Sequence, residues 1–344
     1  MTEPGILCAS NLLYFLESCS NHYYKGDTPI MRLVSFSTHE LPTPHLGLVH
    51  VDEVVDVDLA GRALNLEVPD QMLDLIDAYE TYLPRLHAIL DKAAGRRFSE
   101  VKTFSEIGAA HKLSAVTLAA PIPRPRKNIM CMAVNYTEHA KETAAVRGRS
   151  AEAPAHPVLF TKAPTTVNGP YSEFVVDPAV STEIDWEVEL GVIIGKGGKN
   201  IRAEDAMSHI FGYTVLNDVT ARDLQSRHKQ FFKGKSLDGS CPMGPWLVTA
   251  EEIADPHHLS LRLLVNGVVK QDGNTKQMVF SIPQIIALLS LGMTLEAGDI
   301  IATGTPSGVG FSRVPPEFLQ PGDIMESDIE GIGMLRNLIV AVQE

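Results

Sequence analysis

The chain has 344 residues, of which 44% are hydrophobic and 21% charged, and its formal net charge is −13. This composition excludes long disordered stretches, and the length exceeds that of one compact core, so we expect two domains. The negative charge, with no run of lysine or arginine, argues against a nucleic-acid partner.

The N-terminal residues 5–16, GILCASNLLYFL, are apolar but lack the basic start of a signal peptide and are too short to span a bilayer. We therefore expect residues 1–30 to be a poorly ordered extension and predict no membrane partner. The chain has four cysteines, whose spacing favours neither a disulfide framework nor a zinc site: Cys8, Cys19, Cys131 and Cys241. A reducing, cytoplasmic location fits this pattern.

Residues 31–120 read as a small α+β domain. Strand-like runs fall at 32–36, 46–51 and 54–59, and apolar residues recur at helical spacing over 70–93, where Pro84 should break or kink the helix. The proline-rich segment 121–128, PIPRPRKN, is the best candidate linker. From 129 to 344, short β-rich runs alternate with Gly, Pro and Asp clusters, which predicts a mostly antiparallel, rolled-up β domain. The predicted class is α+β, predominantly β.

An acidic alternation follows at 185–190, DWEVEL. If this segment is a strand, Asp185, Glu187 and Glu189 share one face, while Trp186 and its apolar neighbours face the core. Carboxylates this close repel one another, and a divalent cation would remove the repulsion. The alternative is an acidic strand face exposed to solvent.

Asp218 ends an apolar run and could supply a third carboxylate beside Glu187 and Glu189, although it could instead shape an Asx turn. Oxygen ligands without thiolate or imidazole favour Mg²⁺, with Mn²⁺ or Ca²⁺ as alternatives, over Zn²⁺.

Two further candidates flank this acidic pattern. His139 and Glu142 would share a helix face, where the carboxylate could orient the imidazole as a base that activates water. Lys235, between a glycine and a Pro/Gly-rich run, could stabilise a developing oxyanion or enolate. The alternatives are an exposed helix pair and a surface lysine.

Taken in order, these segments resemble the fumarylacetoacetate hydrolase family from about residue 128 to 338. The matching stretches are NYTEHAKE, FTKAPTTVNGP, DWEVELGVIIGK, GYTVLNDVTARDLQ, GKSLDGSCPMGPWLVT, VNGVVKQDGNTKQMVF, GDIIATGTPSGVG and GIGMLRN. The resemblance implies a mixed β-sandwich roll behind a smaller N-terminal domain, and a homodimer.

The resemblance also implies roles for individual residues. Glu187, Glu189 and Asp218 match the metal ligands of the family. His139 and Glu142 match the water-activating pair on a short helix, and Lys235 matches the lysine beside the substrate. Arg222, Gln225 and Thr305 fall where family members contact the substrate or line its pocket. One departure is Ala133-Val134, where acylpyruvate-type members carry Gly-Arg, because valine cannot bind a substrate carboxylate as arginine can.

These roles predict a metal-dependent hydrolase that cleaves a carbon–carbon bond in a 2,4-dioxo acid of the acylpyruvate type, through an enolate. The same site could support decarboxylation of a 2-oxo acid, isomerisation of a 2-hydroxyhepta-2,4-diene-1,7-dioate type of substrate, or dehydration of a sugar-derived 2-oxo acid. A catalytically silent metal-binding scaffold is the alternative from a different class.

Overall fold

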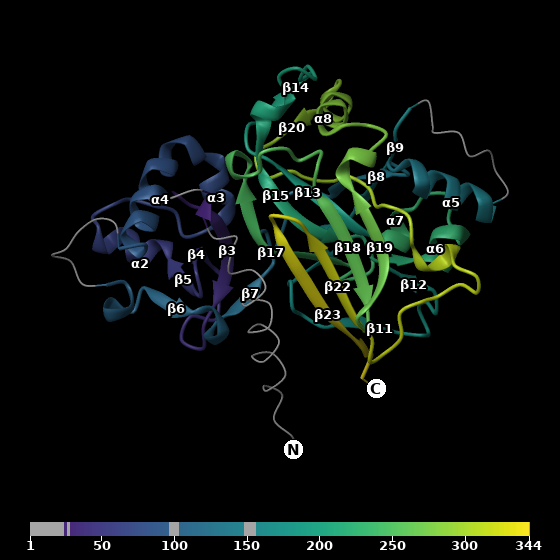
Figure 1. Ribbon diagram of the computed structural model, residues 1–344, viewed down its shortest axis with the longest axis horizontal. Helices are drawn as coiled ribbons and strands as arrows, with labels where there is room; N and C mark the ends of the chain where they lie inside the picture. The colour runs from purple at the N-terminus through teal and green to yellow at the C-terminus, as the bar shows by residue number, and fades with distance from the viewer. Residues whose placement is uncertain (1–23, 26–27, 96–102, 148–155, 344) are drawn as a thin grey trace.

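The computed structural model describes residues 24–25, 28–95, 103–147 and 156–343 (Figure 1). Most of the predicted extension, residues 1–30, lies outside these ranges. Within it, β1 (Tyr24–Lys25) and β2 (Thr28–Pro29) pair antiparallel.

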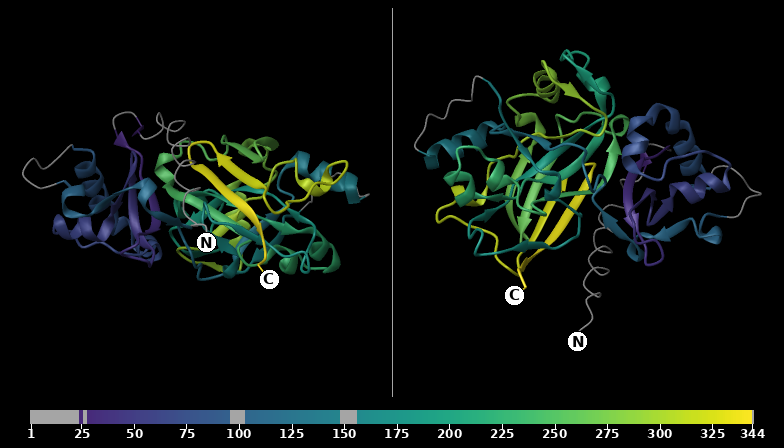
Figure 2. Two further views of the ribbon diagram at one scale, coloured as in Figure 1. Left: turned by 90° about the horizontal axis from the view of Figure 1, so that it is seen from below. Right: turned by 180° about the vertical axis from the view of Figure 1, so that it is seen from behind.

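The N-terminal unit lies to one side of the larger body in all three views (Figures 1 and 2). Its strands and helices are β3 (Arg32–Ser37), β4 (His45–His50), β5 (Glu53–Asp56), α2 (Val57–Ala63), α3 (Met72–Asp77), α4 (Tyr79–Ala93), β6 (Ala110–Lys112) and β7 (Thr117–Ala119). The predicted strand 54–59 stops at Asp56, because this carboxylate accepts a hydrogen bond from the Leu59 N–H and caps α2.

The helical pattern over 70–93 breaks at Ala78, not at Pro84 as the sequence suggested. Ala78 has φ −136° and ψ 35°, which ends α3 and starts α4. Pro84 lies inside α4 on its exposed face, where the carbonyl that loses its partner can turn toward water.

The main sheet runs through both units in the order β6-β5-β4-β3-β17-β15-β13-β21-β8-β9. The strands that the larger body contributes are β8 (Ile129–Ala133), β9 (Val158–Lys162), β13 (Val188–Ile194), β15 (Ile210–Asn217), β17 (Cys241–Thr249) and β21 (Ile300–Ala302). Strands β3 and β17 join the two units, with Leu33 opposite Leu247 and Arg32 opposite Val248. The predicted division at 121–128 therefore falls in a connection between strands of one continuous sheet, and Ile122 within it is fully buried.

A second sheet packs on the larger body in the order β11-β23-β22-β18-β19. Its strands are β11 (Phe174–Val176), β18 (Ser260–Val265), β19 (Val268–Asn274), β22 (Ile324–Ile329) and β23 (Gly333–Ala341). Inward-facing residues of the two sheets form one core cluster, in which Val188, Leu190 and Val215 meet Leu261 and Met325. The arrangement confirms the predicted mixed, predominantly β sandwich.

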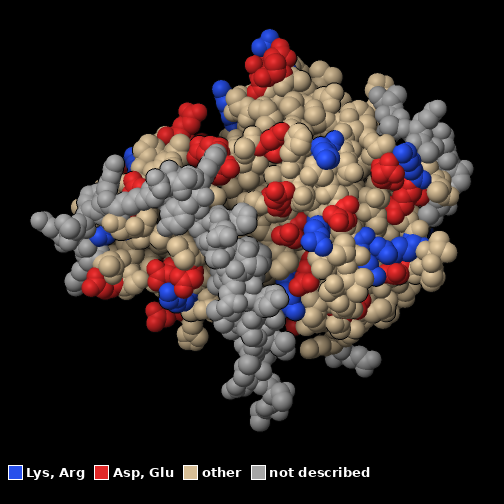
Figure 3. Space-filling view, viewed as in Figure 1, with Lys and Arg blue, Asp and Glu red and all other residues tan. Residues whose placement is uncertain are grey.

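Short elements complete the body: β10 (Val167–Asn168), β12 (Ile184–Asp185), β14 (Gly198–Lys199), β16 (Thr220–Ala221), β20 (Thr294–Leu295), α5 (Thr137–Arg147), α6 (Arg222–Arg227), α7 (Phe232–Lys235) and α8 (Ile282–Ser290). Helices α5, α6 and α7 gather at one end of the sandwich, to the right in Figure 1. Acidic and basic side chains are interspersed over the face in Figure 3. Among the described residues, every helix is too short or too polar to cross a bilayer.

Candidate active site

The acidic segment 185–190 is a strand interrupted at its centre. β12 ends at Asp185 and β13 begins at Val188, so the backbone N–H groups between them need other partners. The Glu187 N–H donates to the side-chain oxygen of Asn217, and the Val188 N–H donates to that of Gln271, both at 3.0 Å. These two buried amides hold the segment where the ladder hydrogen bonds are missing.

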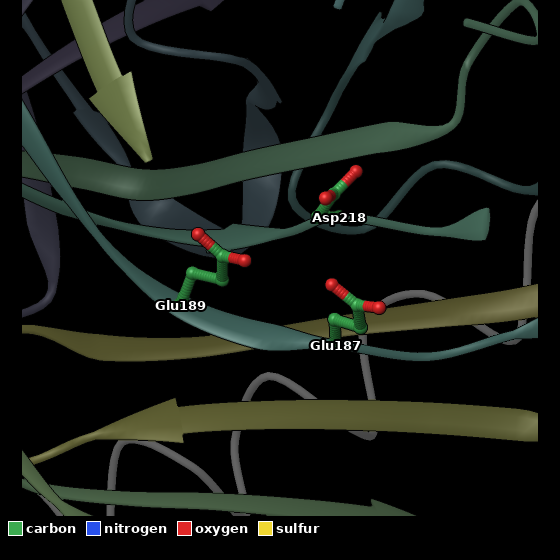
Figure 4. Close-up of side chains that lie close together, drawn as sticks. All are labelled: Glu187, Glu189 and Asp218. Atoms are coloured by element: carbon green, nitrogen blue, oxygen red, sulfur yellow. The ribbon is translucent and has the colours of Figure 1, made fainter. Parts of the chain in front are cut away.

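The carboxylates of Glu187, Glu189 and Asp218 converge in one buried space (Figure 4). Glu187 lies in the gap just before β13, Glu189 is the second residue of β13, and Asp218 follows the last residue of the neighbouring strand β15. One ligand oxygen from each residue lies within 4.8 Å of the others. The alternation along the sequence thus places two carboxylates beside a third from a separate segment.

Asp185 does not join this group, although the alternation put it on the same face. Its carboxylate accepts hydrogen bonds from Arg222 Nε at 2.8 Å and from the N–H groups of Gly310 and Phe311 at 2.7 and 3.0 Å. Asp185 therefore fixes Arg222 and the loop after β21.

Three buried cations surround the carboxylates. Lys235 Nζ lies 2.9 Å from Glu187 and 2.6 Å from Asp218, and Lys162 Nζ lies 2.7 Å from the other oxygen of Asp218. Arg222 lies 2.7 Å from Glu187. Burial alone would raise the pKa of Glu187, but Lys235 and Arg222 outweigh it, so this carboxylate stays ionised.

Glu189 is the carboxylate that these cations leave unpaired. Among the described residues, four acids (Asp185, Glu187, Glu189 and Asp218) face three bases (Lys162, Arg222 and Lys235), which leaves one net negative charge. Burial, followed by the charges of Asp218 and Glu187, raises the pKa of Glu189 well above its usual value, and the hydrogen bond from the Gly304 N–H at 2.7 Å does not offset this. An all-oxygen donor set with an uncompensated buried charge fits a divalent cation of the Mg²⁺ or Mn²⁺ type.

The histidine–glutamate pair lies on α5, beside this group. His139 Nδ1 is 3.2 Å from a Glu142 carboxylate oxygen, and His139 is 6% exposed, so the pair is not a surface feature. The Glu142 carboxylate also accepts hydrogen bonds from the Gly308 N–H and the Ser312 hydroxyl. Burial raises the pKa of Glu142, but the hydrogen bonds of His139 and Ser312 prevail and lower it, so Glu142 is an anion that can support an imidazolium.

One cavity connects these groups. The space between its lining residues is about 410 Å³ with the open mouth included. Its lining consists of Met132, Ala133, Val134, His139, Thr143, Phe160, Glu187, Arg222, Gln225, Phe231, Lys235, Thr305 and Phe311.

The predicted substrate residues all line this cavity, but most of their polar atoms are engaged. Gln225 accepts a hydrogen bond from Arg222 at 3.2 Å. The Thr305 hydroxyl donates to the Val188 carbonyl at 2.9 Å and accepts from Gln271. Thr305 therefore braces β13 as well as lining the cavity.

The sequence analysis did not single out Lys162, which contacts a carboxylate of the site. Lys162 is fully buried against Asp218, and its ammonium also donates to the Val219 carbonyl and the Ser240 hydroxyl. Within a family motif it was one basic residue among several, and only the fold reveals that it faces a carboxylate 56 positions away.

This fold and this site define the class of the protein. The fumarylacetoacetate (FAA) hydrolase C-terminal family matches residues 128–340, so the chain belongs to the fumarylacetoacetate hydrolase family of enzymes. The match covers every element of the site described above.

Individual relatives are similar over nearly the whole chain. An oxaloacetate tautomerase of Bacillus subtilis is 45% identical over 89% of this chain and 100% of its own length. A mitochondrial oxaloacetate tautomerase of Homo sapiens is 41% identical over 90% of this chain and 92% of its own.

Solved structures agree in fold. A fumarylacetoacetate hydrolase from Exiguobacterium antarcticum has a TM-score of 0.71 at 37% identity, covering 91% of this chain and 100% of that one. A maleylpyruvate hydrolase from Sphingobium, solved with manganese(II) and pyruvate, has a TM-score of 0.69 at 32% identity over the same shares. Family relatives thus carry both tautomerase and hydrolase names.

Proposed function

We propose that this enzyme interconverts the keto and enol forms of a small 2-oxo dicarboxylic acid in a reaction that depends on a divalent metal, with oxaloacetate as the first substrate to test. The observation that carries the proposal is the buried carboxylate group with one uncompensated negative charge, placed beside a histidine that is hydrogen-bonded to Glu142. Oxaloacetate tautomerases 41–45% identical over about nine-tenths of the chain support it.

The cation fits between Glu187, Glu189 and Asp218, with Mg²⁺ as the expected ion. When bound there, it would supply a Lewis acid that stabilises negative charge developing on the substrate. It also turns the net charge of the site from −1 to +1, which favours an anionic substrate.

Proton transfer falls to the residues of the chain. We assign His139 to remove a proton from the carbon next to the 2-oxo group, because it lines the cavity and is oriented by Glu142. The 2-oxo oxygen then takes a proton, from the imidazolium or from water, to give the enol, and the reverse sequence restores the keto form. Lys235 lines the same cavity as a buried cation, where it stabilises negative charge that develops on the 2-oxo oxygen.

Hydrolysis of an acylpyruvate is the second candidate, and the same pair favours it. A histidine oriented by a half-buried carboxylate can take a proton from water or from carbon. The similarity to the maleylpyruvate hydrolase solved with pyruvate supports this reading. The two reactions differ in product, since only hydrolysis releases pyruvate from an acylpyruvate.

One experiment separates these reactions. The purified chain is assayed with Mg²⁺ or Mn²⁺, with and without EDTA, for loss of enol absorbance from oxaloacetate and for pyruvate release from a set of acylpyruvates. We expect metal-dependent loss of the enol. Pyruvate release without tautomerase activity would replace the first candidate with the second, and no turnover of any 2-oxo acid would leave the non-catalytic scaffold.

The His139→Ala variant tests the assigned base. We expect a loss of about 10²- to 10⁴-fold in kcat with the metal affinity retained, because His139 is not among the carboxylate ligands. His258→Ala is the matched control, since that histidine is exposed and contacts the exposed residue Asp255. Near-normal turnover in His139→Ala would refute the assignment.

Homodimerisation and a cytoplasmic location stay predictions from the sequence. Light scattering coupled to size-exclusion chromatography would measure the mass of the assembly. A mass of 37.5 kDa, that of one chain, would contradict the dimer.

A further inference from the structure

The hydroxyl of Thr143 is a polar group of the cavity that the proposed reaction does not yet use. Thr143 lies on α5 one turn after His139, so the two side chains share a helix face, and both line the cavity. Its Oγ1 is buried and has no hydrogen-bond partner among the described residues. A threonine inside a helix commonly donates its hydroxyl to a carbonyl of the preceding turn. The Thr143 hydroxyl lacks this hydrogen bond and can therefore donate to another acceptor.

A buried hydroxyl without a partner is unfavourable, because it has given up its hydrogen bonds to water. The cost disappears when a bound molecule accepts the hydrogen bond. Since Thr143 lines the cavity that also contains His139 and Lys235, the substrate is the molecule placed to do so.

Several other polar groups of the cavity already have partners among the described residues. Lys235 and Arg222 are ion-paired with the carboxylates of the site, and the Thr305 hydroxyl donates to a backbone carbonyl. Val134 contributes an apolar wall, so no charge is offered there to the far end of a substrate. Of the two threonine hydroxyls in this lining, the Thr143 hydroxyl is the one without a hydrogen-bond partner among the described residues.

We propose that Thr143 binds substrate and determines specificity: its hydroxyl donates a hydrogen bond to the distal carboxylate of a 2-oxo dicarboxylic acid, the carboxylate farther from the 2-oxo group. This inference rests on the proposed function for its substrate class. A hydrogen bond to a charged acceptor is stronger than one between neutral groups, so a single hydroxyl can discriminate between ligands. Because α5 also carries His139, a substrate held in this way is aligned with the base.

The matched ligands for the test are oxaloacetate and pyruvate, which share the 2-oxo acid head and differ by the distal carboxylate. Dissociation constants are measured by calorimetry in Mg²⁺ at low temperature for Thr143→Val, which keeps the shape without the hydroxyl, and for Thr143→Ser, which keeps the hydroxyl. Thr137→Val makes the same chemical change at an exposed position of α5.

We expect Thr143→Val to weaken oxaloacetate binding about tenfold, equivalent to about 1.4 kcal/mol, and to weaken pyruvate binding less than twofold. Thr143→Ser should stay within about threefold of the wild type for both ligands, and Thr137→Val should match the wild type. Equal losses for both ligands would show that Thr143 only supports the helix, and no loss for either, or an equal loss in Thr143→Ser, would also overturn the proposal.

The readout does not depend on turnover. A wild type that binds oxaloacetate with this Thr143 dependence, yet fails to consume its enol, would refute the proposed tautomerisation and leave the role of Thr143 intact. The reverse result, tautomerisation without the selective binding loss, would refute the role of Thr143 alone.

Discussion

Replacing Glu189 with glutamine tests the charge balance of the site most directly. In the metal-free protein this carboxylate is buried, has a raised pKa and lies beside two like charges. A glutamine amide keeps the acceptor for the Gly304 N–H and can donate to a neighbouring carboxylate, while it removes the excess charge. We therefore expect the substitution to weaken metal binding and yet stabilise the metal-free fold.

The magnitude follows from linkage. A ligand at 100 times its dissociation constant stabilises the folded state by about 2.7 kcal/mol. With an unfolding entropy of about 2.1 cal/mol/K per residue, 344 residues give about 0.7 kcal/mol/K, so metal should raise the Tm of the wild type by about 4 °C. Glu189→Gln should shift by less than about 1 °C at the same metal concentration.

The direction in which the stability of the metal-free protein changes with pH follows from the pKa of Glu189. Because the pKa of Glu189 is raised in the folded state, the folded protein holds this proton more tightly, and its stability falls as pH rises above the unfolded value of 4.5. The Tm advantage of metal-free Glu189→Gln should therefore grow from pH 5 to pH 8.

Differential scanning fluorimetry with EDTA or added Mn²⁺ measures both effects, and Glu204→Gln, at an exposed surface pair, is the control. A full metal-induced shift in Glu189→Gln, or a metal-free variant less stable than the wild type at pH 8, would refute the reasoning.

Two other predictions concern groups outside the carboxylate cluster. Burial raises the pKa of Asp328 to about 6, and Arg262 opposes this only in part. Ionisation of Asp328 as the pH rises above 3.8 should therefore lower the free energy of unfolding by up to about 3 kcal/mol. In Asp328→Asn, the free energy of unfolding measured with urea should change less between pH 4 and 7 than in the wild type, and an equal change would contradict this. Ser312→Ala removes one hydrogen bond to Glu142 and should lower kcat about fivefold with metal affinity retained, as for a net loss of about 1 kcal/mol. Recovery in Ser312→Thr would support the hydrogen bond, whereas equal losses in both variants would indicate disturbed packing.

Local periodicity in the sequence predicted two arrangements of the candidate site that the structure contains. Alternation along one strand put Glu187 and Glu189 on one face, and an i, i+3 spacing put His139 beside Glu142. Both patterns act over a few residues, where strand and helix geometry suffice.

Contacts between distant segments were not readable in the same way. The pairing of Lys162 with Asp218 and the amide of Gln271 on the Val188 backbone depend on how the strands are ordered in the sheets. The predicted helix break at Pro84 was wrong for a related reason. Pro84 is tolerated inside α4 because tertiary packing leaves its face of the helix exposed.

The pairing of β3 with β17 has a practical consequence for anyone who wishes to shorten this protein. Removing residues 1–120 would strip the partner from the backbone at Leu247 and Val248 and leave an apolar strand as a new border of the sheet. Such a border invites other chains to add to it, so the matched family region expressed alone should self-associate. By pairing β3 with β17, the N-terminal unit keeps this part of β17 from being an exposed edge strand.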